Sequence, residues 1–470
     1  MKIKNITILA LLILITACTT PEKKRITIFY TADEHGWFND SEKADGAAAL
    51  MHLWRERENY SLEADSFLVI SGGDNWTGSS VSTWFQGRSM FEIMQVLGYD
   101  VSALGNHEFD FSLDTLKARA TSSSFPFIAA NMTNSEGDIP SFMKAWHIVE
   151  ANGVKVGLLG LANLETPHTT TPVAVEDMTF SAYDEAVKKY VPILKDNGAQ
   201  VIIIVGHLCK AEMESLTALA ASYGIPLITG GHCHAQVLEK QDDVLMIESE
   251  AYLQSYIKVV LEYDPNTETS EAISYEVVPI ISEQRDEELA SIIEGWEQKA
   301  SKSLDDVVGY AAHTIPQHSD MMHDLFMMSW INSFASTDVA ITNNGSIRQD
   351  IEAGDITMAD ILGLLPFNNG LLQLKVTGEE MNAFIKALPQ MKEEYIWGGM
   401  DASSHFDDDK TYTLLTTDFL YSLEETQFKI YDANPYFSGL SYREPIIQTL
   451  RDLQSNKENP LENVLQSIVK

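Results

Sequence analysis

Five short apolar segments in the N-terminal half of the chain end directly at residues of the types that bind metal ions. Segments of this length, rich in Val and Ile and closed by Gly, Asp or Asn, are typical of buried β-strands. Ligands of α/β proteins gather beyond the carboxyl ends of such strands, so we expect these side chains to converge on one edge of one sheet and to hold metal. The segments are RITIFYTADEHG (Asp33, His35), FLVISGGD (Asp74), VSALGNHEFD (Asn106, His107, Asp110), VIIIVGH (His207) and IPLITGGHCH (His232, His234).

Segments with helical spacing of apolar residues lie between these strands, at 46–60, 89–99, 181–198 and 209–224. Further strands are expected at 154–162, 244–252 and 255–264, and the last two alternate in the manner of an antiparallel pair at a sheet edge. The alternation predicts an α/β domain over residues 26–281, built as a layered β-sandwich flanked by helices. At 470 residues the chain is long for one core, so a second domain is expected.

An acidic segment with a thin apolar stripe, residues 282–305, predicts a helix that connects two domains or lies on the surface of the first. From residue 306 new strands are expected near 338–345, 370–378 and 410–420, with helices at 321–335 and 378–390. Clusters of His and Asp do not recur there. Residues 306–470 are therefore expected to form a second, smaller α/β domain that recognises the substrate.

The N-terminus has the features of a targeting segment over residues 1–18: the basic MKIKN, the apolar ITILALLILIT, and small residues before Cys18. The apolar stretch is too short for a stable membrane span and fits a cleaved signal, followed by a polar tether at 19–25. Its ending, LITAC, resembles the bacterial lipoprotein cleavage motif, which implies lipidation of Cys18 and a site in the bacterial cell envelope, facing the periplasm or exterior. An ordinary signal peptide is the alternative.

Two other cysteines, Cys209 and Cys233, lie next to the expected histidine ligands. A disulfide or a thiolate ligand would suit an oxidising compartment. We favour two buried free cysteines, one at each strand end.

The chain carries 68 Asp and Glu against 32 Lys and Arg, a net charge of −36. Such a surface repels polyanions, so binding of a nucleic-acid polymer is not expected. To bind a small phosphorylated substrate, the protein needs metal ions or arginines that make the electrostatic potential positive at the binding site.

The spacing of the metal-binding types carries chemical information. Asp33 and His35 project to the same side of a strand end, and the carboxylate of Asp74, after two glycines, can bridge two cations about 3.5–4 Å apart. Asn106 offers an amide oxygen, which suits a divalent ion. His107 is either a further ligand or an acid oriented by Asp110. A core histidine explains any one of these positions but not all of them together.

The order D-x-H, GD, GNHEFD, GH and GHCH resembles the calcineurin-like metallophosphoesterases. Over nearly the whole mature chain the layout is similar to the bacterial 5′-nucleotidase / UDP-sugar hydrolase family. The resemblance implies one ion held by Asp33, His35, Asp74 and His234, and a second by Asp74, Asn106, His207 and His232. It implies that His107 and Asp110 form the catalytic dyad. It implies two divalent ions, and the donor types suit Zn, Mn, Co and Fe alike.

The C-terminal part shows a weaker resemblance. NNGSIR (343–348) is similar to the family's phosphate-binding segment, which implies that Arg348 grips phosphate. LPFNNG (365–370) implies that Phe367 stacks on a base and that Asn369 contacts it. The family's additional arginines are missing from HSDMMHDLF, and its second stacking aromatic is missing as well. In its place Phe428, Tyr431, Tyr436 and Phe437 are candidates.

These observations predict an exported dinuclear-metal phosphohydrolase that releases phosphate from nucleoside 5′-phosphates by attack of a metal-activated hydroxide. A UDP-sugar hydrolase, a 2′,3′-cyclic phosphodiesterase or another phosphoester hydrolase on the same scaffold is the alternative. A catalytically dead nucleotide-binding lipoprotein is disfavoured, because every expected ligand and both dyad residues are present.

Overall fold

The computed structural model describes residues 21–40, 44–170, 172–334, 336–391, 394–399 and 405–468. Cys18 and the expected signal segment lie outside these residues. Within the described ranges, none of the helices combines the length and the apolar character needed to span a membrane.

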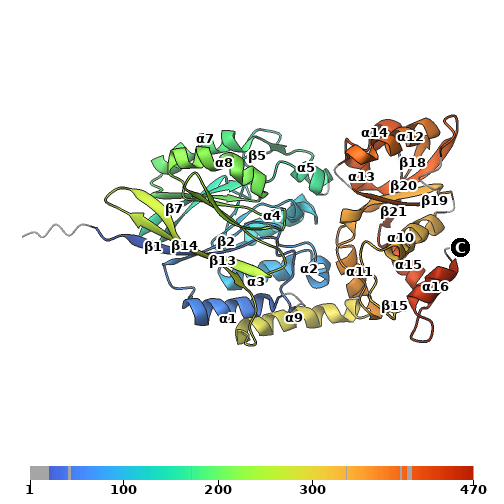
Figure 1. Ribbon diagram of the computed structural model, residues 1–470, viewed down its shortest axis with the longest axis horizontal. Coiled ribbons are helices and arrows are strands. Elements are labelled where there is room, and N and C mark those ends of the chain that lie inside the picture. The colour runs from blue at the N-terminus through green and yellow to red at the C-terminus, as the bar shows by residue number, and fades with distance from the viewer. Residues whose placement is uncertain are drawn as a thin grey trace, which may run out of the picture.

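The first sheet runs through the N-terminal domain, on the left in Figure 1, and contains the first three ligand-bearing strands. β1 to β4 run parallel, while β13 and β14 continue the sheet antiparallel beside β1. Its strands, in spatial order, are β14 (Thr269–Pro279), β13 (Ser255–Asp264), β1 (Lys24–Thr31), β2 (Phe67–Ser71), β3 (Val101–Ala103) and β4 (Phe127–Ile128).

The second sheet packs face to face on the first. Its four central strands are parallel and its two outer strands antiparallel. The spatial order is β11 (Gln236–Gln241), β12 (Val244–Ser249), β10 (Leu227–Thr229), β9 (Val201–Gly206), β7 (Val154–Leu161) and β6 (Trp146–Ala151). Val and Ile side chains of β1, β2, β7 and β9 form one buried core between the sheets. These strands are buried on both faces, which explains their continuous apolar sequences.

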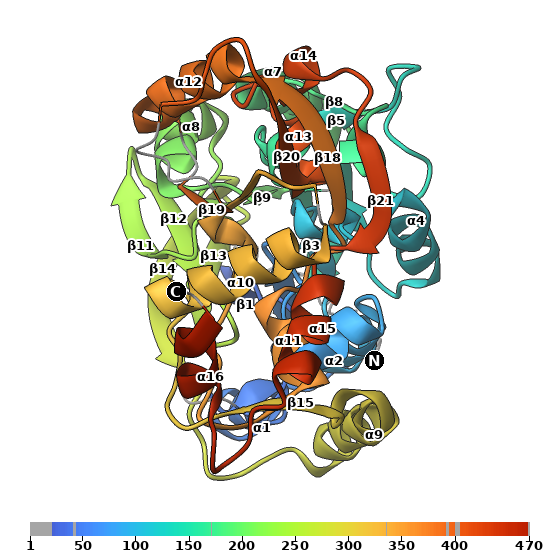
Figure 2. The same ribbon diagram turned by 90° about the vertical axis from the view of Figure 1, so that its right-hand side faces the viewer.

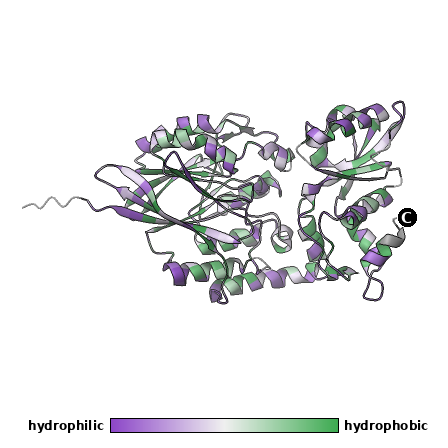
Figure 3. Cartoon of the chain, viewed as in Figure 1, coloured by the Kyte–Doolittle hydropathy of each residue, from purple (hydrophilic) through white to green (hydrophobic). Residues whose placement is uncertain are grey.

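Helices cover both outer faces of this sandwich. α1 (Gly46–Glu58) and α3 (Arg88–Leu97) pack on the first sheet, and α7 (Tyr183–Asp196) and α8 (Lys210–Tyr223) on the second. All four match the helices expected from the sequence. Figure 3 shows hydrophilic residues on the outward faces of α7 and α1. The shorter elements are α2 (Ser80–Trp84), η1 (His107–Phe109), α4 (Leu113–Ser122), β5 (Met132–Thr133), α5 (Thr166–Thr169), α6 (Pro172–Val175) and β8 (Thr179–Phe180). The expected α/β sandwich flanked by helices is confirmed.

The expected antiparallel pairing of 244–252 with 255–264 is wrong. β12 pairs with β10 and β11 in the second sheet, whereas β13 pairs with β1 and β14 in the first. The chain crosses from one sheet to the other between them, through a connection in which Glu250, Tyr252 and Leu253 have positive φ. Alternating hydropathy identifies a strand but not its partner, which is why sequence reasoning joined two neighbours in the chain.

The C-terminal domain, which faces the viewer in Figure 2, is built on a five-stranded mixed sheet in the described part of the chain. Its order is β19 (Tyr395–Gly399), β16 (Val339–Asn343), β20 (Thr411–Thr417), β18 (Gly370–Thr377) and β21 (Tyr436–Ser441). α10 (Asp320–Ser333), α15 (Glu444–Leu453) and α16 (Leu461–Ile468) contribute to the core on one face. α12 (Gly378–Ala387), α13 (Asp418–Ser422) and α14 (Phe428–Tyr431) cover the other face. The smaller elements are β15 (Val307–Ala311), η2 (Asn344–Ser346), β17 (Gly354–Thr357), α11 (Met358–Leu364) and η3 (Leu388–Gln390).

Helix α9 (Glu287–Leu304) runs along the lower edge of the molecule in Figure 1, between the two domains. Leu289 and Ile293, in its first half, pack into the core of the N-terminal domain. Its C-terminal end packs through Ala300 and Leu304 against Leu362 of α11. Helix α9 therefore both packs on the surface of the first domain and connects it to the second, the two alternatives that were open for residues 282–305. The boundaries at residues 281 and 305 stay predictions.

Candidate active site

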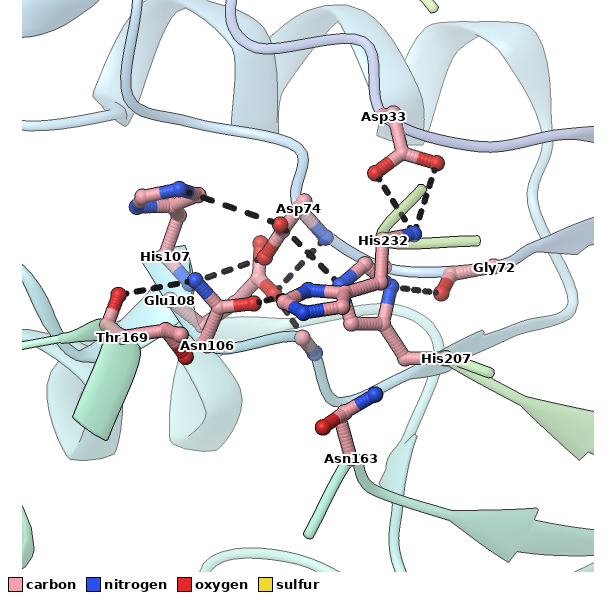
Figure 4. A network of polar contacts seen from close by, with 12 residues as sticks. Asp33, Gly72, Asp74, Asn106, His107, Glu108, Asn163, Thr169, His207 and His232 are labelled. Carbon is pink, nitrogen blue, oxygen red and sulfur yellow. Dashed lines mark hydrogen bonds and ion pairs between the residues drawn. The ribbon is translucent and has the colours of Figure 1, made fainter. Parts of the chain in front are cut away.

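The structure brings all seven expected metal ligands together, but at the shared end of two sheets and not at one sheet. Figure 4 labels five of them: Asp33, Asp74, Asn106, His207 and His232. Asp33, Asp74 and Asn106 follow β1, β2 and β3 of the first sheet, whereas His207 and His232 follow β9 and β10 of the second. The expectation of one sheet is therefore wrong. The convergence still occurs because the stacked sheets present the carboxyl ends of their parallel strands at the same end of the sandwich.

The first cluster consists of Asp33, His35 and His234, whose ligand atoms all lie within 4.8 Å of one another. The Nε2 atoms of the two imidazoles are 2.9 Å apart, and Nε2 of His234 is 3.7 Å from Oδ1 of Asp33. Nδ1 of His35 lies 2.8 Å from the carbonyl of Thr77 and donates to it, so Nε2 presents its lone pair to the cluster. These atoms suit the coordination of one cation.

The second cluster consists of Asp74, His207 and His232. Nδ1 of His207 donates to the carbonyl of Gly72 over 2.8 Å, so its Nε2 faces Oδ2 of Asp74 at 3.0 Å. This Nε2 is buried and has no hydrogen-bond partner among the described residues. Nδ1 of His232 lies 2.9 Å from Oδ1 of Asn106. Nitrogen and oxygen atoms placed in this way fit a cation held between them.

Asp74 also joins a group with His35 and His107, so among the described residues it connects both halves of the centre. Burial raises the pKa of Asp74, but the charges of His207 and His107 outweigh it and hold that pKa well below its ordinary value. Asp74 is therefore ionised and joins the second cluster to His35 of the first, the position expected of a bridging ligand.

The protonation of the imidazoles supports metal binding. Burial lowers the pKa of His35 well below its ordinary value and lowers those of His232 and His234 to about 4. These three side chains are therefore neutral at pH 7, the form that binds metal. Burial also lowers the pKa of His207, but Asp74 outweighs this effect and raises it to about 10. The position between His207 and Asp74 thus attracts positive charge.

The backbone at the site is strained. Five of the seven expected ligands have left-handed φ angles, a conformation that non-glycine residues adopt at a cost of about 1–3 kcal/mol each. They are Asp33 (55°), His35 (48°), Asp74 (59°), His232 (74°) and His234 (53°). Neighbouring glycines permit the close packing: a Cβ on Gly105 would lie 2.2 Å from Oδ1 of Asp74. Strain of this kind concentrates at functional sites, and here it coincides with the expected ligands.

Glu108, which sequence reasoning did not single out, fixes two of the ligand loops. Its carboxylate is fully buried and accepts from the backbone N–H groups of Asp74 (3.0 Å), Asn75 (2.7 Å) and Gly105 (2.8 Å). It thereby joins the loop after β2 to the loop after β3. An acidic residue within GNHEFD, flanked by ligand and dyad residues, was the available sequence signal.

His107 and Asp110 form the expected pair. Nδ1 of His107 lies 2.7 Å from Oδ2 of Asp110, and Oδ1 of Asp110 accepts from Oγ1 of Thr170 over 2.9 Å. Nε2 of His107 is 4.0 Å from Oδ2 of Asp74. Burial lowers the pKa of His107, but the charges of Asp110 and Asp74 outweigh it and raise that pKa. The imidazolium is thus stabilised next to the metal ligands, as an acid requires.

A cavity of about 210 Å³ lies between the domains and opens onto this centre. Asp74, Asn106, His107, Asp110, His232 and His234 line it from the N-terminal domain. The three expected substrate residues, Arg348, Phe367 and Asn369, line it from the C-terminal domain. The ring of Phe367 stacks on the imidazole of His107, and the guanidinium of Arg348 lies 5.6 Å from the centroid of that ring. The substrate residues and the metal ligands thus share one space.

Two family models match separate parts of the chain, one in each half. Residues 26–236 match the calcineurin-like phosphoesterases, and residues 307–406 match the 5′-nucleotidase C-terminal domain. The chain belongs to the 5′-nucleotidase family. This 5′-nucleotidase family member is a metal-dependent phosphoester hydrolase.

Individual relatives support the assignment to the 5′-nucleotidase family. It is 25% identical to protein UshA of Yersinia enterocolitica over 423 residues, 78% of this chain and 76% of UshA. It is also 25% identical over 402 residues to endonuclease YhcR of Bacillus subtilis, and there it covers 76% of its own length but only 33% of YhcR. The structure of a 5′-nucleotidase precursor from Thermus thermophilus superimposes with a TM-score of 0.76 at 19% identity, over 92% of this chain and 97% of that one. At this identity the superposition shows the fold alone.

The second aromatic ring of the cavity is Phe419, in α13 directly after strand β20. None of the four aromatic residues expected for this role lines the cavity. Phe428 is buried in the domain core, where Tyr431 packs against it, and Tyr436 and Phe437 are exposed on the outermost strand β21. Phe419 follows the end of a buried strand, a sequence signal that it shares with the metal ligands, but this signal does not show that the ring reaches the cavity.

A second interdomain cavity, of about 490 Å³, begins where the first one ends at Arg348. Its lining includes His35, Trp37 and Tyr252 from the N-terminal domain and Asp350 and Glu352 from the C-terminal domain. The rings of Trp37 and Tyr252 meet edge to face with centroids 5.9 Å apart. Sequence reasoning did not identify this cavity.

Cys209 and Cys233 form a disulfide, so the expectation of two free cysteines is wrong. β9 and β10 are adjacent parallel strands, and their following loops bring the two Cα atoms within 5.3 Å. The sequence alone does not show that the two strands are neighbours, so it does not indicate that the two cysteines are close.

Proposed function

We propose that this chain is an exported enzyme, lipid-anchored at Cys18, that releases phosphate from nucleoside 5′-phosphates with two divalent ions. The cavity that joins the metal-ligand clusters to Arg348, Phe367 and Phe419 supports this proposal most strongly. In this proposal the same cavity binds both the phosphate and the base of one small molecule. With a net charge of −36, the chain suits a small nucleotide better than a polynucleotide, even though one relative is an endonuclease.

In this proposal Asp33, His35, Asp74 and His234 hold one ion, and Asp74, Asn106, His207 and His232 hold the other. Imidazole, carboxylate and amide donors suit Zn²⁺, Mn²⁺, Co²⁺ and Fe²⁺ alike. When bound, the ions supply an activated water molecule and neutralise charge on the phosphate.

The remaining roles belong to side chains of the cavity. Arg348 pairs with the phosphate, for which a planar guanidinium is well suited. His107, oriented by Asp110, donates a proton to the oxygen of the departing nucleoside. Phe367 and Phe419 flank the base, and Asn369 contacts its polar edge. Stacking supplies affinity for any base, at about 1–3 kcal/mol for each ring, with little discrimination between bases.

The decisive experiment uses the full-length chain, extracted from membranes, stripped of metal and reloaded separately with Zn²⁺, Mn²⁺ or Co²⁺. Phosphate release is followed from AMP, UMP, UDP-glucose, 2′,3′-cyclic AMP and p-nitrophenyl phosphate. We expect kcat/KM for the 5′-monophosphates to exceed that for the aryl phosphate at least tenfold. Hydrolysis of the aryl phosphate alone would exclude the nucleotidase, and no turnover with any metal would leave a catalytically dead binding protein.

Lipid anchoring has its own test. Labelled palmitate added to cells should be incorporated into the wild-type chain and not into Cys18→Ser. The unmodified variant should leave the membrane fraction or retain its signal segment. Equal labelling of both chains would refute the anchor.

The second cavity favours UDP-sugar hydrolysis as a second candidate activity. Because Arg348 lines both cavities, a phosphate held there can carry one substituent into each. The aromatic pair Trp37 and Tyr252, facing Asp350 and Glu352, suits a sugar, whose C–H face packs on rings and whose hydroxyls donate to carboxylates. Trp37→Ala should then lower kcat/KM for UDP-glucose about tenfold and leave that for UMP unchanged. An equal loss for both substrates would remove this candidate.

A further inference from the structure

The disulfide joins the two loops that carry three of the expected histidine ligands. Cys209 lies two residues after His207, where the chain leaves β9 and enters helix α8. Cys233 lies between His232 and His234, beyond the end of β10. A single covalent bond therefore connects the position of His207 to the positions of the other two.

On its α8 side the disulfide is attached to a rigid part of the domain. The N–H of Cys209 donates to Oε2 of Glu212 over 2.8 Å, and Oε1 of Glu212 accepts from the hydroxyl of Tyr183 over 2.7 Å. Met213 and Leu216 of the same helix are buried in the core against the second sheet. Cys209 therefore has little freedom to move.

The loop on the other side is strained and lies near the surface. His232 and His234 both have left-handed φ angles, and Cys233 between them is exposed. Hydrogen bonds also restrain this loop: the N–H of His232 donates to Asp33 (3.0 Å), that of Cys233 to the carbonyl of Gly231 (2.8 Å), and that of Ala235 to Oε1 of Glu248 (2.9 Å). Without further restraint, such a loop would relax towards unstrained backbone angles and carry both imidazoles away from the centre.

We infer that the Cys209–Cys233 disulfide is a clip that holds His232 and His234 in their ligand positions, so that its oxidation state sets how long the bound ions are retained. This inference rests on the ligand roles proposed above. Cys209 and Cys233 are positioning residues, since neither belongs to a candidate metal cluster among the described residues. The exposed Cys233 makes the bond accessible to reductants of the thiol or phosphine class.

Reduction breaks one S–S bond and yields two thiols by transfer of two electrons. With a phosphine, the phosphorus is oxidised to the phosphine oxide, and water supplies its oxygen and the two thiol protons. A phosphine serves as the reagent because a dithiol would itself bind the released metal.

The test uses the full-length chain carrying Cys18→Ser, loaded with Co²⁺, in three forms: oxidised, reduced by phosphine and desalted under argon, and the double variant Cys209→Ser, Cys233→Ser. Excess EDTA is added, and release of Co²⁺ is followed by elemental analysis and by the visible spectrum of the bound ion. We expect release to be about 10-fold to 100-fold faster in the reduced and the double-variant forms. At saturating Co²⁺ their kcat should stay within about threefold of the parent, since the chemical groups are unchanged.

Leu216→Ala is the matched control, because it weakens packing of the same helix without touching the disulfide. Its Tm should fall while its rate of metal release stays that of the oxidised parent. Equal release rates in the oxidised, reduced and double-variant forms would contradict this inference. It would also be contradicted if Leu216→Ala accelerated metal release as much as reduction does. Metal release is measured without substrate. Its result therefore does not depend on whether the chain hydrolyses nucleotides, and the two proposals can fail separately.

Discussion

The imidazole of His107 and the phenyl ring of Phe367 stack across the domain boundary, with ring centroids 5.4 Å apart and planes inclined by 17°. His107 belongs to the proposed dyad, whereas Phe367 belongs to the proposed nucleotide pocket. The group proposed to deliver the proton and the group proposed to hold the base are therefore in direct contact. In the proposed function, this contact couples binding of the base to protonation of the departing nucleoside.

Phe367→Ala should impair both steps, whereas Phe419→Ala should impair only binding. Loss of either ring removes stacking worth about 1–3 kcal/mol and should raise KM for AMP about 10-fold to 100-fold. Only Phe367 contacts His107, so only Phe367→Ala should also lower kcat for p-nitrophenyl phosphate, which has no base to stack. Steady-state kinetics with both substrates test this. Equal kcat values of the two variants on the aryl phosphate would mean that the stack does not position His107.

His107→Ala should slow catalysis without loss of metal. General acids contribute about 10²-fold to 10⁴-fold, so kcat should fall within that range while bound metal stays near two per chain. His207→Ala is the contrast, because its Nε2 lies 3.0 Å from Asp74 and has no other partner among the described residues. Elemental analysis of the purified variants should show metal lost from His207→Ala only. Loss of metal from His107→Ala would identify His107 as a ligand.

The strand ends carried most of the predictable information. A run of buried Val and Ile that ends at a polar residue fixes both the strand and the place of that residue, so the positions of Asp33, Asp74 and His207 followed from the sequence. Pairing between strands did not follow, because β12 and β13 have similar patterns and belong to different sheets. The sequence therefore indicated a common edge but not that two sheets form it.

Contacts between loops were harder to predict than the ligands themselves. The disulfide depends on β9 and β10 being neighbours, and Phe419 reaches the cavity only because the C-terminal domain faces the metal centre. Glu108 acts through three backbone N–H groups from two separate loops, none of which has a sequence signature. Each of these features depends on tertiary structure, which residue types and spacing do not specify.

Asp100→Asn should stabilise the protein at neutral pH and not at pH 4. Burial raises the pKa of Asp100 to about 6 from an ordinary value of 3.8, although its carboxylate accepts from the N–H of Val69 over 2.8 Å. Between these two values the folded chain holds a proton that the unfolded chain releases, so stability falls as pH rises from about 4 to 6, and the loss persists above pH 6. The two pKa values correspond to about 3 kcal/mol at most.

Asparagine does not titrate and its amide oxygen still accepts from Val69. Urea unfolding of the metal-free parent and variant at pH 4, 5, 6 and 7 should therefore show a growing difference in the free energy of unfolding in favour of Asp100→Asn. A difference that is constant across this range would contradict the assignment, since only a titrating carboxyl gives it a pH dependence.

Gly105→Ala should empty the metal centre by displacing Asp74. A Cβ at this position would lie 2.2 Å from Oδ1 of Asp74 and 2.5 Å from its backbone nitrogen, so the carboxylate between the two clusters must move. We expect bound metal to fall well below that of the parent and kcat/KM for AMP to fall at least about 100-fold, because the ions supply the activated water.

Gly295→Ala, in helix α9, is the matched control: nothing lies within 4 Å of the added methyl group, and alanine should stabilise the helix by about 0.5–1 kcal/mol. Elemental analysis, kinetics and Tm of the two variants test the prediction together. Full metal content in Gly105→Ala would show that the loop after β3 yields to the added methyl group, and that close packing against Asp74 does not fix the bridging ligand.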